Sequence, residues 1–255
     1  MFVYRSVGDT NVGRVRKHNE DAYFRDDELG LYIVADGLGG HAAGEVASEE
    51  TVHTIKAWIK RERPKVLGLM ENPYDEELHN QGQRILESAI QAATYMVHAM
   101  AEYDETKAGM GTTVSVLLVV GCVAFLGQVG DSRIYLTRDG QIAQVTDDHT
   151  LIAAQIREGM ITAEEARYAP HRNVITRAVG SHDYVEVDTR VVEVVPGDRF
   201  LLCTDGLHGY LETDEETLQH MVMEPEKAIK ALIDMALVRG GKDNITSVLV
   251  EVVEG

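Results

Sequence analysis

The sequence is poor in positive charge and in proline. Its 255 residues include 24 Lys and Arg against 42 Asp and Glu, which gives a formal net charge of −18. A chain this acidic repels the phosphates of nucleic acids and anionic membrane surfaces, so neither is expected as a partner. Only five residues are proline, 26% are charged and 44% are hydrophobic. These values exclude a disordered or collagen-like chain and indicate a globular protein.

Cysteines and long apolar runs are scarce as well. No stretch reaches the roughly 18 apolar residues that a membrane helix needs, and residues 1–6 show no basic segment followed by an apolar one. The two cysteines, Cys122 and Cys203, lie in apolar runs typical of strands, which favours buried free thiols over a disulfide framework. We therefore expect an unanchored protein of the reducing cytoplasm.

Short runs rich in Val, Ile and Leu, bounded by Gly, Asp or Asn, predict β-strands. They cover residues 31–35, 113–120, 123–129, 133–137, 185–195 and 199–203. Several are only a few residues apart, which favours antiparallel hairpins over crossover connections. Helical spacing of apolar residues appears in 42–61, 83–102 and 226–238. Each predicted helix has one apolar stripe, so the pattern predicts a layered α+β protein with helices covering β-sheets.

No linker, charge block or internal repeat divides the sequence, so we predict one domain over residues 1–255. Between about 147 and 180 the apolar pattern loosens, and short helices are predicted at 150–158 and 162–167, followed by a turn at 170–173. A segment this long with little strand character is typical of a surface flap.

Four aspartates stand at the ends of predicted strands or in turns, each beside Gly, Ser or Asn. They are Asp36, Asp131, Asp205 and Asp243. Taken singly, each is most simply a turn residue. Taken together, carboxylates at the same edge of a sheet repel strongly and need cations. Oxygen ligands from aspartates and backbone carbonyls suit Mg²⁺ or Mn²⁺ better than zinc. Two such ions can activate a water molecule and hold a phosphoryl group.

The polar segment 13–21 adds Arg16, Glu20 and Asp21 near the N-terminus. One interpretation is a solvated loop of mixed charge. The other is an arginine that binds phosphate through two hydrogen bonds, with acids that organise metal-bound water. The segment alone does not decide between them.

Seven motifs along the chain together resemble the metal-dependent protein serine/threonine phosphatases of type 2C, and particularly their compact bacterial members. In family order, the motifs are residues 15–21, 34–41, 109–113, 129–133, 175–180, 203–207 and 243–246. Each is weak alone, but their order over nearly the whole chain is specific. The resemblance implies an αββα sandwich, and it implies hydrolysis of phosphoserine and phosphothreonine by direct attack of a metal-bridging hydroxide.

The resemblance also implies roles for individual residues. Asp36 matches the bridging metal ligand and Gly37 the residue whose carbonyl binds one ion. Asp205 and Asp243 match the remaining ligands of the other ion, and Asp131 matches the acid that, with Asp205, holds a third, weaker ion in bacterial members. Arg16 matches the phosphate-binding arginine, and Glu20 and Asp21 match acids that act through metal-bound water. The implied cofactors are Mn²⁺ or Mg²⁺, and the implied partners are proteins phosphorylated by a serine/threonine kinase.

One position departs from many animal members of the family. They have His two residues after the bridging aspartate, where it can protonate the leaving alkoxide, whereas this chain has Leu38. Bacterial relatives share an apolar residue there, so activity is not excluded. His41 and a metal-bound water are both candidates for the general acid, and His41 is equally well explained as a loop or helix-start residue, because only geometry decides such assignments.

Two other functions fit the same residues. A non-enzymatic binding module could keep the phosphatase fold. A missing metal ligand would favour this function, but all four aspartates and Arg16 are present. An enzyme acting on a small phosphoester would have the same metal centre, and only the flap and substrate competition would distinguish it from a protein phosphatase.

Overall fold

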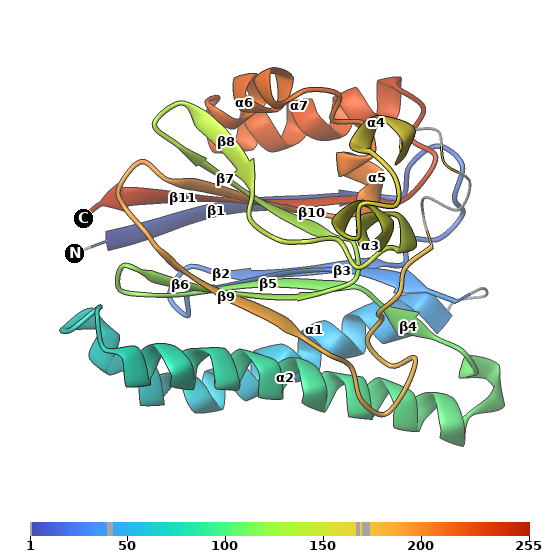
Figure 1. Cartoon of the computed structure of the whole chain (residues 1–255), viewed down its shortest axis with the longest axis horizontal. Coiled ribbons are helices and arrows are strands. Elements are labelled where there is room, and N and C mark those ends of the chain that lie inside the picture. Colours follow the sequence, from blue (N-terminus) through green and yellow to red (C-terminus); the bar gives the residue numbers. More distant parts are fainter. Residues whose placement is uncertain (1, 40–42, 167–168, 170–173) are drawn as a thin grey trace.

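The computed structural model describes residues 2–39, 43–166, 169 and 174–255. Two antiparallel sheets lie face to face, and helices cover the outer face of each, so the molecule has four layers (Figure 1). This arrangement confirms the predicted α+β class and the αββα sandwich.

The first sheet has the strand order β1–β11–β10–β7–β8. Its strands are β1 (Phe2–Asn11), β11 (Ile245–Glu254), β10 (Arg199–Cys203), β7 (Arg133–Arg138) and β8 (Gln141–Gln144). The terminal strands β1 and β11 pair along their whole length, from Phe2 opposite Glu254 to Asn11 opposite Ile245. The two ends of the described chain are therefore joined in one sheet.

The second sheet has the order β2–β3–β5–β6–β9, with β4 paired to the end of β3. Its strands are β2 (Asp21–Asp26), β3 (Leu31–Leu38), β4 (Gly111–Thr112), β5 (Val114–Val120), β6 (Val123–Val129) and β9 (Asp188–Glu193). Strand β9 is shorter than the predicted run 185–195, because only residues 188–193 pair with β6.

The two longest helices, α1 and α2, pack together on one side of the sandwich. The α-helices are α1 (Ala43–Glu62), α2 (Glu76–Tyr103), α3 (Leu151–Arg157), α4 (Ala163–Ala166), α5 (Asp205–His208), α6 (Asp214–Met221) and α7 (Pro225–Val238), and the 3-10 helices are η1 (Arg63–Met70) and η2 (Glu105–Lys107). Helix α2 begins seven residues before the predicted residue 83. Asp75 caps it by accepting hydrogen bonds from the backbone N–H groups of Glu77 and Leu78.

Alternation along β5 shows how one strand serves two cores. Val116 and Leu118 point toward α1 and α2, whereas Leu117 and Val119 point into the space between the sheets. Because successive strand residues face opposite sides, a strand buried on both faces must be apolar throughout. All residues of 114–120 except Ser115 are apolar. A third core lies between α7 and the first sheet.

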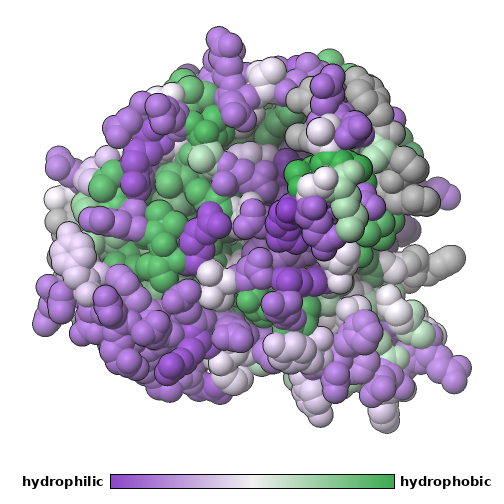
Figure 2. Space-filling view, viewed as in Figure 1, coloured by the Kyte–Doolittle hydropathy of each residue, from purple (hydrophilic) through white to green (hydrophobic). Residues whose placement is uncertain are grey.

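The core between the sheets reaches the surface along one side. Figure 2 shows apolar side chains on this face, where the edges of the two sheets lie. Val145 and Val192 are partly buried there and pack against the core between the sheets. None of the helices that the structure describes is long and apolar enough to cross a membrane.

Both cysteines are free in the described structure. Cys203 is buried in β10, as predicted, but Cys122 is only partly buried because it lies in the turn between β5 and β6 rather than inside a strand. The prediction of a second buried strand thiol was therefore wrong, and the cytoplasmic setting argued from these residues stays a prediction.

Gly82 should be essential for the packing of α2 on the second sheet. A Cβ atom on this residue would lie 2.3 Å from ring atoms of Phe125, which is fully buried in β6. We expect Gly82→Ala to lower the free energy of unfolding by about 1–3 kcal/mol, because overpacking outweighs the better helix propensity of alanine. Urea denaturation would measure this change. Ser88→Ala on the exposed face of the same helix is the matched control, and equal effects of the two changes would contradict this packing argument.

Candidate metal and phosphate site

The acidic residues singled out in the sequence gather at one end of the sandwich. Asp36 lies in β3 opposite Asp21 of β2. Asp131 lies in the loop between β6 and β7, Asp205 begins α5 two residues after the end of β10, and Asp243 stands two residues before β11. Strands of both sheets end at this point, so the topology brings together carboxylates as distant in the sequence as Asp36 and Asp243, which are 207 residues apart.

These carboxylates line a cavity of about 450 Å³. Its walls include Asp36, Asp131, Asp205 and Asp243, together with Gly37 and, from the N-terminal segment, Arg16 and Glu20. A neighbouring cavity of about 530 Å³ shares three of the aspartates and is bounded on its far side by α3. The segment predicted as a flap therefore lies beside the acidic cluster.

Burial and mutual repulsion raise the pKa values of the clustered carboxyl groups. Burial is the main cause for Asp36, whose pKa is well above its usual range, and the charges of Asp21 and Asp205 add to it. The pKa of Asp131 rises to about 7, again through burial and then through Asp205. The pKa of Asp205 is raised by burial and by Asp243. Such a cluster favours protons or other cations.

Asp21 lies beneath this cluster rather than in the cavity. It is buried, and one of its carboxylate oxygens accepts a hydrogen bond of 2.9 Å from Thr204 Oγ1. Burial raises the pKa of Asp21 to about 7, against the opposing effect of hydrogen bonds from Thr246 and Thr204. Because Thr204 directly precedes Asp205, this bond links β2 to the start of α5.

Arg16 is held by one of the predicted metal ligands. Its Nη2 donates a hydrogen bond of 2.7 Å to Asp243 Oδ2, and this bond is the main cause of its raised pKa. The guanidinium side chain is nevertheless 51% exposed. Since a guanidinium has five N–H donors, most of them remain available to an anion in the cavity.

Gly37 is required by packing. A Cβ atom here would lie 2.2 Å from the carbonyl oxygen of Gly44 and 2.5 Å from that of Glu20. The backbone N–H of Gly37 also donates a hydrogen bond to the Glu20 carbonyl oxygen at 3.1 Å. The close approach of three backbone segments thus explains this glycine without reference to a metal, and its role as a carbonyl ligand stays a prediction.

The cluster fits divalent cations in its chemistry. Oδ1 of Asp205 is buried without a hydrogen-bond partner in the described structure, as is Oδ1 of Asp21. Carboxylate oxygens gathered around a polar cavity are the donors that Mg²⁺ and Mn²⁺ prefer. Within residues 2–39, 43–166, 169 and 174–255, no three acidic, His or Cys side chains converge closely enough to hold one ion together. One of these carboxylates, that of Asp243, is paired with Arg16 instead.

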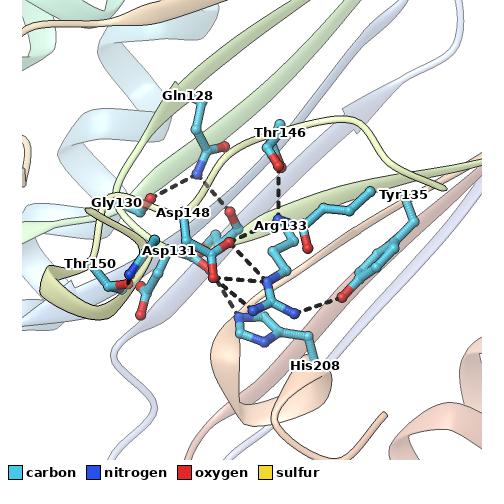
Figure 3. Close-up of polar contacts among 12 residues, drawn as sticks. Gln128, Gly130, Asp131, Arg133, Tyr135, Thr146, Asp148, Thr150 and His208 are labelled. Atoms are coloured by element: carbon cyan, nitrogen blue, oxygen red, sulfur yellow. Dashed lines mark hydrogen bonds and ion pairs between the residues drawn. The ribbon is translucent and has the colours of Figure 1, made fainter. Parts of the chain in front are cut away.

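The loop that carries Asp131 is fixed by a polar network (Figure 3). Gln128 Nε2 donates to the carbonyl oxygens of Gly130 and Ser132, at 3.0 and 2.6 Å. His208 Nε2 donates to the carbonyl oxygen of Asp131 at 2.9 Å, and burial lowers the pKa of this histidine to about 3. Next to this loop, the Arg133 guanidinium pairs with Asp148 at 2.7 Å.

Several positioning residues escaped the sequence prediction. Thr113 Oγ1 contacts both the backbone N–H of Asp36, at 3.1 Å, and the hydroxyl of Ser132, at 2.7 Å. Asn244 binds the backbone of Val12, His18 and Glu20, which ties the N-terminal segment to the turn that carries Asp243. Both residues belong to the quoted motifs, and for Asn244 the signal was a polar side chain directly after the predicted ligand Asp243.

The remaining predictions have mixed outcomes. Glu20 lines the cavity, and burial raises its pKa. Leu38 lies there too, at the end of β3 opposite Gly111, so an apolar side chain occupies that position. His41 and the turn predicted at 170–173 lie outside the described residues. In the predicted flap, α3 and α4 correspond to the two expected short helices.

Comparison with known proteins identifies the family. The model of the protein phosphatase 2C family matches residues 11–249. The serine/threonine protein phosphatase PstP of Mycobacterium tuberculosis is 37% identical over 255 residues, which cover 99% of this chain and 46% of PstP. The serine/threonine phosphatase stp of Listeria monocytogenes is 38% identical over 95% of this chain and 93% of its own length.

A solved structure has a similar fold and contains metal ions. The catalytic domain of PstP in complex with two manganese ions superposes with a TM-score of 0.84 at 35% identity, and the match covers 100% of both chains. The present chain belongs to the protein phosphatase 2C family. It spans about half the length of the Mycobacterium tuberculosis PstP that it matches.

The raised pKa of Asp131 predicts a pH-dependent cost of folding without metal. A carboxyl group whose pKa rises on folding favours the folded state at low pH, and that advantage is lost as pH rises from about 4, its unfolded value, to about 7. In chelator, Asp131→Asn should match the wild type at pH 4. By pH 8 it should be more stable by about 2–4 kcal/mol.

Urea denaturation at both pH values would measure the difference. Asp139→Asn, at an exposed position in the turn between β7 and β8, is the control for the substitution itself. A stabilisation by Asp131→Asn that is equal at pH 4 and pH 8 would contradict the electrostatic origin.

Proposed function

We propose that this protein is a metal-dependent serine/threonine phosphatase that removes phosphate from phosphoproteins. The observation that carries the proposal is the shared cavity of four aspartates and Arg16 in a chain of the protein phosphatase 2C family. The domain is proposed to extend over residues 1–255, with 147–180 as the flap beside the site.

The proposed cofactors are two Mn²⁺ or Mg²⁺ ions, with a third, weaker ion. When bound, such ions supply a water molecule of lowered pKa and neutralise charge on the phosphoryl group. Asp36, Asp205 and Asp243 would hold the core ions together with the Gly37 carbonyl, and Asp131 with Asp205 would hold the third. The manganese ions seen with the PstP catalytic domain support this choice of metal.

Arg16 is the proposed phosphate-binding residue. Its exposed guanidinium lies at the cavity edge, where its remaining N–H groups can donate to phosphoryl oxygens. Hydrogen bonds of this kind become stronger as charge builds up on those oxygens in the transition state. Glu20 and Asp21 are proposed to orient water around the ions. Cys203 is buried in β10, so neither the fold nor the mechanism gives it a role as nucleophile.

Phosphate release from a phosphothreonine peptide tests this function. We expect turnover with Mn²⁺, none with chelator, and a loss of at least about 100-fold in Asp205→Asn, because an ion would lose a ligand. Cys122→Ser and Cys203→Ser are matched controls that should keep metal-dependent turnover. An inactive wild-type protein that is folded and binds Mn²⁺ would contradict the proposal and favour a binding module. Faster hydrolysis of small phosphoesters than of any phosphopeptide would also contradict it.

The net charge of −18 predicts which phosphopeptides react fastest. An acidic surface attracts basic substrates and repels acidic ones over a Debye length of about 10 Å at 0.1 M salt. We expect kcat/KM for a phosphothreonine peptide with Lys and Arg flanks to exceed that of its Asp and Glu counterpart by roughly tenfold at low salt. The ratio should shrink as salt is added. A ratio that does not depend on salt would assign the preference to local contacts instead.

A further inference from the structure

His149 is a buried histidine that no predicted role uses. It lies two residues before α3, at the start of the predicted flap, and its exposed fraction is 1%. Its ring lies between the loop that carries Asp131 and strand β9, since its two nitrogens contact Gly130 and Asp188. A buried imidazole with both nitrogens engaged has a fixed orientation and a fixed tautomer.

The tautomer follows from the contact with Gly130. The backbone N–H of Gly130 donates to His149 Nδ1 at 3.2 Å, so Nδ1 carries no proton and the ring proton is on Nε2. Nε2 then donates to Asp188 Oδ2 at 3.1 Å. Arg177 Nη1 also lies 3.2 Å from Nε2, and because a guanidinium only donates, it cannot accept the Nε2 proton. The other carboxylate oxygen of Asp188 accepts a hydrogen bond of 2.7 Å from Arg177. Asp188 thus anchors His149 and Arg177 to β9.

The backbone of His149 makes further contacts on both sides. Its N–H donates to the carbonyl oxygen of Gly130 at 2.9 Å, so Gly130 and His149 are joined by two hydrogen bonds. Its carbonyl oxygen accepts a bond of 2.7 Å from the N–H of Thr176. Thr150 and Ile175 form an isolated antiparallel bridge beside it. The two ends of the flap segment therefore meet at this residue.

The peptide groups around Asp131 are thus held from two sides. His208, on the helix that begins with Asp205, holds the Asp131 carbonyl oxygen (Figure 3). His149 holds Gly130 from the flap side. Gly130 itself has a φ of 96°, which a residue with a side chain rarely adopts. With both neighbouring peptides fixed, the direction in which the Asp131 side chain leaves the backbone is also fixed.

We propose that His149 is a positioning residue: it fixes the direction of the Asp131 carboxylate and holds the base of the flap in place relative to it. The neutral imidazole orients the Gly130 peptide through Nδ1, and its backbone closes the flap at Thr176. The inference rests on the proposed function, which makes Asp131 a ligand of the third, weaker ion. Groups that orient a ligand typically change metal affinity by 10–100-fold when they are removed.

Two amide substitutions distinguish the roles of the two ring nitrogens of His149. In His149→Asn the amide oxygen can take the place of Nδ1 and accept from Gly130. In His149→Gln the longer side chain brings its amide to the place of Nε2, near Asp188, and the Gly130 acceptor is lost. We expect the weakest Mn²⁺ site of His149→Gln to lose affinity by about 10-fold or more, and that of His149→Asn to stay within a few-fold of the wild type. His220→Gln, in α6, is the control for the substitution itself.

Calorimetric Mn²⁺ titration would measure the affinity, and hydrogen–deuterium exchange of peptides covering 126–132 and 150–157 would measure the positioning. Without metal, both peptides should exchange faster in His149→Gln than in the wild type, with 126–132 protected in His149→Asn. Equal Mn²⁺ affinity and exchange in folded His149→Gln and wild type would overturn the proposal. Equal losses in both variants would also overturn it, since burial of the ring alone would then explain them. Exchange of the metal-free protein needs no turnover, so it separates failure of this inference from failure of the proposed phosphatase activity.

Discussion

Repulsion among buried carboxylates is the constraint on which this structure depends. Asp36, Asp131 and Asp205 are all shifted toward protonation, each mainly by burial and then by the charges of its neighbours. Such a group can be held together only by a frame that is stable for other reasons. Two sheets with three apolar cores supply that frame, and the acids stand where strands of both sheets end. The uncompensated charge of the cluster thereby favours protons or other cations.

Strands β1, β2, β4, β8 and β11 were not predicted from the sequence, but the other six strands that the structure describes were, the clearest of them because they are apolar on both faces. Residues 114–120 and 123–129 have this character and are strands as expected. Strand β1 was missed because its residues are half-buried and polar ones such as Arg5, Ser6 and Asp9 interrupt its apolar pattern, and β11 stabilises it along its whole length. The same reason applies to the start of α2, whose first turn is polar and is defined by its cap at Asp75.

The candidate site was predictable in its acids but not in the contacts that hold them. Asp beside Gly, Ser or Asn at a strand end is a local signal, and the four aspartates do line one cavity. The bond from Thr204 to Asp21 joins residues 183 apart, and that from His208 to Asp131 joins residues 77 apart. No local pattern encodes such pairs, because they exist only when the sheets have assembled. The ion pair of Arg16 with Asp243 belongs to the same class.

That ion pair leaves guanidinium donors exposed at the edge of an acidic cavity. Asp243 is 34% exposed and Arg16 is 51% exposed, so water screens their attraction and the pair is only weakly held. Asp131 is buried, and the described structure offers it no such partner for its carboxylate. The affinity of the cluster for cations therefore arises at its buried members, while the exposed arginine at the rim keeps donors free for an anion. This separation of buried acids from an exposed cation lets one cavity attract both charges, although the whole chain carries −18.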